Sequence, residues 1–109
     1  MQRIIAVDFD GTLCEDRWPE IGRANMPVLR RLRRAKTLGG AKLILWTCRT
    51  GLHLDEAVAW CAERGITFDA VNQNLPELIE AFGHDTRKIF ANEYWDDRAR
   101  NIRFEEERE

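Results

Sequence analysis

Short apolar runs alternate along the chain with longer stretches whose apolar residues recur at a helical period. Strands that alternate with helices in this way favour a parallel sheet covered on both faces. The apolar runs predict strands over about 3–8, 42–46, 66–71 and 89–95. The helical stretches predict helices over about 25–38, 54–64 and 74–82, and glycines 39, 40 and 65 end the first two.

The first predicted helix shows its buried stripe most clearly, with Leu29, Leu32, Ala35 and Leu38 on one face. Asn25 is a suitable N-terminal cap for this helix. Asn74, with Glu77 three residues later, resembles a capping box at the start of the third predicted helix.

Two segments fit neither period. Residues 14–24, which include Trp18-Pro19, predict an irregular excursion beside the first strand. The charged residues after Asp97 predict a frayed terminal helix.

Composition narrows the class of protein. A chain of 109 residues is long enough for one domain, spanning 1–109, with a real core but no separate lid domain. The net charge of −2 offers no overall basic field for nucleic acid. No apolar run reaches membrane-spanning length, and the N-terminus lacks a secretory signal pattern. The scattered cysteines Cys14, Cys48 and Cys61 indicate free thiols in a reducing cytoplasm.

The first strand runs directly into Asp8-Phe9-Asp10-Gly11-Thr12. Side chains alternate along an extended backbone, so Asp8 and Asp10 project to the same side just past the carboxyl end of the strand. Ligands of open α/β sheets bind at that edge. Two such close carboxylates repel each other unless a cation or a shared proton joins them. The pattern therefore indicates a metal-dependent site; a structural calcium-like site or a solvated turn is the alternative.

Further polar groups follow later strand ends. Thr47 and Arg49 follow the second strand and suit phosphoryl oxygens, although Thr47 also suits a helix cap and Arg49 a surface salt bridge. Lys88, which competes with Arg87, precedes the last strand. Asp96 and Asp97 end that strand, where an ordinary exposed turn is the alternative.

The order Asp-x-Asp-Gly-Thr, then Thr47, Lys88 and Asp96-Asp97, resembles the haloacid dehalogenase (HAD) superfamily of phosphatases over essentially the whole chain. The resemblance implies a Rossmann-like three-layer sandwich with a mainly parallel sheet in the order 3-2-1-4. It also implies a HAD-like core without a cap domain, because residues 13–24 leave room only for a small flap. Asn92-Glu93, in place of the usual apolar pair, departs from the family pattern and puts the start of the last strand in doubt.

The resemblance also implies the roles of single residues. Asp8 is the nucleophile that becomes an aspartyl phosphate, and Asp10 is the acid and base. Thr47 and Lys88 hold the phosphoryl oxygens. Mg²⁺ is bound by Asp8, by the backbone carbonyl of Asp10 and by Asp96 or Asp97, with Asp96 as the preferred direct ligand.

Substrate contacts are expected from Gly11, Thr12, Arg49 and Trp18, where Trp18 either stacks on a substrate ring or packs over its own loop. A small-molecule phosphomonoester is the expected substrate, such as a nucleotide, a sugar phosphate or a polynucleotide end. The arginine-rich first predicted helix is read as solvated surface, with nucleic-acid contact as the weaker alternative. The sequence does not indicate the oligomeric state.

A non-catalytic magnesium-binding module of the receiver type is the competing function. Receiver domains place their phosphorylated aspartate at the end of the third strand, whereas Asp69 falls too early in that strand to fit well.

Overall fold

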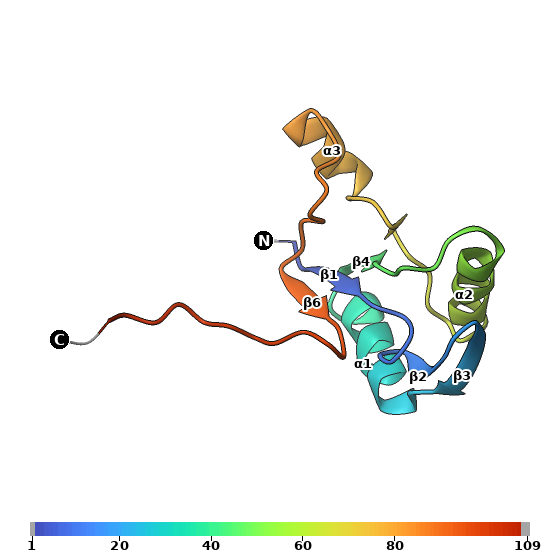
Figure 1. Ribbon diagram of the computed structural model, residues 1–109. Helices are drawn as coiled ribbons and strands as arrows, with labels where there is room; N and C mark the ends of the chain where they lie inside the picture. Colours follow the sequence, from blue (N-terminus) through green and yellow to red (C-terminus); the bar gives the residue numbers. More distant parts are fainter. Residues whose placement is uncertain (1, 108–109) are drawn as a thin grey trace.

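A four-stranded sheet lies at the centre of the computed structural model, which describes residues 2–107 (Figure 1). Its strands stand in the order β5–β4–β1–β6, and each neighbouring pair is parallel. The strand bounds are Ile4–Val7 for β1, Lys42–Leu45 for β4, Ala70–Val71 for β5 and Glu93–Trp95 for β6. The predicted α/β class with a mainly parallel sheet is confirmed.

Helices cover both faces of this sheet. They are α1 (Met26–Thr37), α2 (Gly51–Glu63) and α3 (Pro76–Phe82). Alternate residues of β1 face opposite layers: Ile5 and Val7 pack with buried residues of α1 and α2, whereas Ile4 and Ala6 pack on the α3 side. Because β1 is buried on both sides, the acids that follow it emerge from the middle of the sheet edge.

The periodic pattern located α1 well. Leu29, Leu32 and Ala35 are buried as predicted. Leu38 is 77% exposed, so its predicted burial is wrong; α1 ends at Thr37, before that residue joins the buried face. Asn25 is the N-cap residue of α1 as predicted, but its side chain makes no capping hydrogen bond and instead donates to the carbonyl of Thr12 (2.9 Å).

The predicted excursion over residues 14–24 is present, but it has regular secondary structure. These residues form an antiparallel hairpin of β2 (Cys14–Arg17) and β3 (Glu20–Ala24), called the flap below. Only Cys14 among the residues of β2 and β3 is fully buried. The hairpin therefore carries no alternation of apolar and polar residues by which the sequence could reveal it.

The two outer strands are shorter than predicted. β5 and β6 retain only the last residues of the runs 66–71 and 89–95. The side chain of Asn92 accepts a hydrogen bond from the backbone of Ile4 beside the start of β6, so polar residues here anchor the strand without lengthening it.

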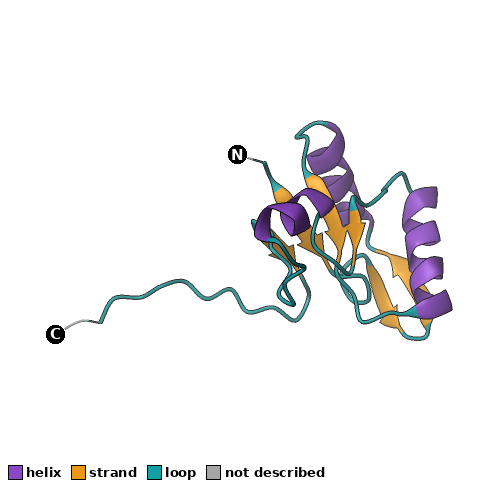
Figure 2. Cartoon of the chain, turned by 90° about the horizontal axis from the view of Figure 1, so that it is seen from above, coloured by secondary structure: helices purple, strands orange, loops and turns teal. Residues whose placement is uncertain are grey.

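Two further predictions at element ends are wrong. Asn74 does not cap α3, because its buried amide bonds to Asp85, Thr86 and the backbone of Phe90. Residues 98–107 form no terminal helix and run away from the domain in both views (Figures 1 and 2). Among the described residues, no helix is long and apolar enough to cross a membrane.

Candidate functional site

Three carboxylates converge at the carboxyl edge of the sheet. Asp8 follows β1 and Asp96 follows β6, and the parallel pairing of these strands brings both residues to one edge. The backbone of Asp8 donates to the carbonyl of Trp95 (2.9 Å), which fixes the two strand ends together. Asp8, Asp96 and Asp97 each offer an oxygen, and these oxygens lie within 4.8 Å of one another.

Electrostatic repulsion and burial act most strongly on Asp8. Its pKa is raised to about 7, first because burial removes water from the carboxylate and then because Asp96 and Asp97 lie close by. The backbone N–H of Phe9 opposes this shift. The three carboxylates repel one another, and a small hard cation bound between them would relieve this repulsion. Mg²⁺ prefers such oxygen ligands. The residues present therefore fit the predicted ion.

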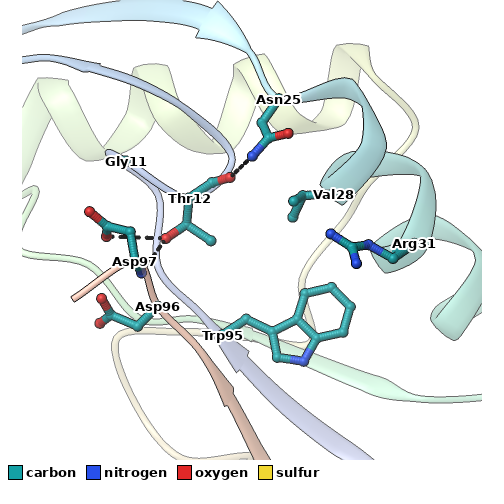
Figure 3. Close-up of a pocket in the computed structure, with 8 residues that line it drawn as sticks. All are labelled: Gly11, Thr12, Asn25, Val28, Arg31, Trp95, Asp96 and Asp97. Carbon is teal, nitrogen blue, oxygen red and sulfur yellow. Dashed lines mark hydrogen bonds between the residues drawn. The ribbon is translucent and has the colours of Figure 1, made fainter. Parts of the chain in front are cut away.

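Asp97 is positioned by hydrogen bonds with the loop that follows β1. The Thr12 hydroxyl donates to Asp97 Oδ1 (3.3 Å) and accepts from the Asp97 backbone (3.0 Å). Gly11 has a positive φ of 87°, and a Cβ there would lie 2.4 Å from Asp97 Oδ2. Figure 3 shows these residues around a pocket of about 370 Å³ whose other side includes Arg31 and Trp95.

Gly11 and Thr12 thus do not line the pocket beside Asp8, where substrate contact was predicted. They line the pocket on the other side of Asp97 and position its carboxylate.

Asp10 and Arg49 form a bidentate ion pair. Arg49 Nε and Nη2 donate to the two carboxylate oxygens of Asp10, each at 2.8 Å. The remaining N–H groups of Arg49 point toward the carbonyls of Pro19, Glu20 and His53 at 3.2 to 3.4 Å. All five guanidinium donors therefore have partners within the protein.

Arg49 is only 1% exposed, so the alternative of a surface salt bridge is wrong. Its guanidinium also lies about 5 Å from the rings of Phe9 and Trp18 (5.0 and 5.1 Å). Arg49 ties the flap to Asp10 and has no N–H left for the predicted phosphate contact.

Trp18 lies in the turn between β2 and β3 and remains 56% exposed. One side of its ring meets Arg49, and its edge meets His53 with the ring centroids 4.8 Å apart. It also lines the pocket beside Asp8, so packing over the flap and contact with a substrate are compatible.

The pocket beside Asp8, called the main pocket below, has a volume of about 410 Å³. Its lining consists of Asp8, Asp10, Asp16, Trp18, Thr47, Cys48, Arg49, Asp96 and Arg98. Four of the predicted site residues besides Asp8 and Asp96 are thus brought together: Asp10, Trp18, Thr47 and Arg49.

Thr47 lies at the end of β4 but does not cap a helix, because α2 begins only at Gly51. Its hydroxyl accepts from the backbone of Arg49 (3.1 Å), and its own backbone N–H donates to Asn72 Oδ1 (2.8 Å). Asn72 was not predicted. Its place directly after β5, at the same sheet edge, is the signal from which it could have been predicted.

Lys88 is not among the residues that line the main pocket. Its side chain is exposed on the segment between α3 and β6, and so is that of its competitor Arg87. Sequence reasoning missed Asp16, Cys48 and Arg98 as lining residues, of which Arg98 follows Asp97 directly.

The cysteines differ in exposure. Cys48 is exposed at the main pocket, whereas Cys14 and Cys61 are buried free thiols. Burial raises the pKa of the Cys61 thiol to about 12, and it also raises the pKa of Cys14.

Among solved structures, the chain is similar to a conserved protein from Bacteroides thetaiotaomicron. The two share 40% sequence identity with a TM-score of 0.79, over 91% of this chain and 78% of the other. No family model matches the chain, and no curated protein matches it.

Proposed function

The chain belongs to the same family as that conserved Bacteroides thetaiotaomicron protein. From its own residues, we propose that it is a magnesium-dependent phosphomonoester hydrolase with a HAD-like core. The observation that carries the proposal is the convergence of Asp8, Asp96 and Asp97 within 4.8 Å at the carboxyl edge of the sheet. The order β5–β4–β1–β6, with the first acid directly after a central strand, supports the proposal of such a core.

Asp8 is the nucleophile of the proposed reaction. One of its oxygens attacks phosphorus, the bond from phosphorus to the leaving oxygen breaks, and the leaving oxygen takes a proton from Asp10. Water then attacks the aspartyl phosphate, Asp10 accepts its proton, and the bond to Asp8 breaks to release inorganic phosphate. Bound Mg²⁺ supplies positive charge that stabilises the phosphoryl oxygens.

Asp10 needs a free oxygen for this proton transfer. Both of its oxygens accept from Arg49, so in the proposed cycle one of them leaves the guanidinium when a substrate enters and takes up a proton from solvent, which it then donates to the leaving oxygen. Arg49 keeps its contacts with the flap carbonyls and holds the other oxygen in place. The Thr47 hydroxyl, which also lines the main pocket, binds a phosphoryl oxygen.

The substrate we propose is a small phosphomonoester. A main pocket of about 410 Å³ accommodates a nucleotide or a sugar phosphate, and the exposed ring of Trp18 offers a stacking surface for a base. The free thiols favour a reducing compartment, and we propose the cytoplasm.

The receiver-type alternative receives no support from Asp69. Its carboxylate accepts from the backbone of Leu43 (2.9 Å) and pairs with Lys36 and Lys42 (3.6 and 3.9 Å). Lys42 and Leu43 lie at the amino end of β4, on the edge opposite Asp8, and Lys36 lies in the last turn of α1. Asp69 is therefore a structural acid, away from the position of a phosphorylated aspartate.

Turnover of para-nitrophenyl phosphate tests the proposal. We expect activity that requires Mg²⁺ and is lost with a chelator. Asp8→Asn should lower kcat by at least about 1,000-fold and Asp10→Asn by about 100-fold, because each removes a reacting group. Asp55→Asn, which changes an exposed acid on α2, is the matched control and should leave turnover unchanged. A wild-type protein that binds Mg²⁺ without turnover of any phosphomonoester would instead favour a binding module.

A further inference from the structure

Charge in the main pocket is unevenly balanced. Asp8, Asp10, Asp16 and Asp96 line it, and the cations among its lining residues are Arg49 and Arg98. A phosphoryl group that enters this pocket brings further negative charge, which has to be stabilised in the transition state. One divalent metal ion beside three carboxylates does not balance the negative charge of the phosphoryl group as well. A positively charged side chain is therefore needed to stabilise the transition state.

Arg49 does not meet this need. It is buried, and its five N–H groups are already directed at Asp10 and at three carbonyl oxygens. Contact with a phosphoryl group would cost Arg49 an existing buried hydrogen bond, which is unfavourable.

Arg98 is held differently. Its backbone N–H donates to Asp96 Oδ1 (2.8 Å), which fixes the base of the residue beside the carboxylate cluster. Its side chain is 83% exposed, and its ion contacts with the residues that the structure describes are long, at 3.7 Å to Asp16 of the flap and 3.9 Å to Asp97. Exposed contacts of this length contribute little to stability, so the guanidinium is free to exchange them.

We propose that Arg98 is a catalytic residue that binds the phosphoryl oxygens of the substrate, an inference that rests on the proposed phosphatase function. On substrate binding, its guanidinium exchanges Asp16 for two phosphoryl oxygens. The planar fork of arginine matches this geometry and stays protonated throughout. Arg98 thereby takes the part that the sequence pattern assigned to Lys88, which is exposed and does not line the main pocket.

The test measures kcat and KM for para-nitrophenyl phosphate at saturating Mg²⁺, together with inhibition by inorganic phosphate. Arg98→Gln should lower kcat/KM by about 100-fold and weaken inhibition by phosphate. Arg98→Lys should recover part of both losses, because it retains the charge but not the fork. Arg100→Gln, which removes a nearby charge on the terminal segment, is the matched control.

A role for Arg98 in positioning Asp96 or Asp97 would give another result. The Mg²⁺ concentration required for half-maximal activity would then rise in Arg98→Gln while inhibition by phosphate stayed unchanged, and this result would overturn the proposal. So would a larger loss in Lys88→Gln than in Arg98→Gln. Absence of any wild-type turnover would count against the phosphatase function itself, whereas an active wild type with an equally active Arg98→Gln variant would count against Arg98 alone.

Discussion

Gly11 shows how one backbone position controls the carboxylate cluster. Substitution by alanine strains a positive φ of 87° and places a Cβ 2.4 Å from Asp97 Oδ2. We expect Gly11→Ala to weaken magnesium binding by about tenfold or more, since even about 1.4 kcal/mol of displacement energy has that effect. Titration calorimetry with Mg²⁺ measures this change directly.

Gly83 provides the matched control for Gly11. It has nearly the same positive φ, 85°, but a Cβ there meets nothing within 4 Å. Gly83→Ala should therefore lower stability through backbone strain alone and leave magnesium binding intact. Equal magnesium affinity in both variants would contradict the contact between Gly11 and Asp97.

Asp8 makes the stability of the metal-free protein depend on pH. Its pKa is 3.8 in the unfolded chain and about 7 in the folded one. As pH rises from about 4 to 7, the unfolded chain ionises freely while the folded chain resists, so the free energy of unfolding falls. After allowance for solvent screening we expect a loss of about 1 to 2 kcal/mol.

Urea denaturation at several pH values, with chelator present, measures this loss. Asp8→Asn should remove it, so the difference between wild type and variant should vary with pH across the same window. A difference that stays constant from pH 4 to 7 would mean that the Asp8 pKa is not raised.

Sequence reasoning found the acids of the site but not their partners. Asp8 could be predicted because it follows the apolar run of β1, whereas Asp96 and Asp97 were found through the order of motifs that resembles the HAD superfamily. The burial of Arg49 could not, because its partner Asp10 is 39 residues away and the carbonyls it binds belong to the flap. Arginine is seldom buried without such partners, and these appear only in the folded structure.

At the scale of elements, the buried side chain of Arg49 joins the turn of the flap to Asp10. Removing Arg49 leaves Asp10 unpaired and frees the carbonyls of Pro19 and Glu20. We expect Arg49→Gln to destabilise the protein by about 3 kcal/mol, because breaking a buried ion pair is costly. Hydrogen exchange should also show faster exchange in β2 and β3.

Arg3 and Glu93 form a comparison pair. They too are joined by two hydrogen bonds (2.6 and 2.9 Å), but both side chains are substantially exposed. Arg3→Gln should therefore change the denaturation midpoint far less than Arg49→Gln. Similar shifts of the denaturation midpoint in the two variants would show that the burial of Arg49 does not increase the contribution of its ion pair to stability.

The elements predicted correctly are those whose pattern repeats. α1 was located by Leu29, Leu32 and Ala35, and β4 by an apolar run that is buried as a central strand requires. The hairpin structure of the flap was missed because its strands pair mainly with each other. Asn74 was misread because a cap residue and a buried loop anchor look alike in sequence, and the difference lies in contacts with Thr86 and Phe90.

For the whole molecule, a cation at the carboxylate cluster should couple to folding. A ligand that binds only the folded state stabilises it by mass action, by about 2.7 kcal/mol at a concentration 100 times its Kd. We expect saturating Mg²⁺ to raise the Tm by roughly 5 °C or more. Asp96→Asn should remove most of this shift and Asp55→Asn none of it, as differential scanning calorimetry can show. An equal shift in all three proteins would place the cation elsewhere.

The unequal exposure of the cysteines allows a fluorescent dye to be attached at one known position. A maleimide dye should attach at Cys48 alone, because Cys14 and Cys61 are buried and the pKa of each thiol is raised. The dye would then lie at the main pocket, whose lining also includes the exposed indole of Trp18, an efficient quencher. Its emission would report any change in the distance between Cys48 and the turn of the flap, in the unmutated chain.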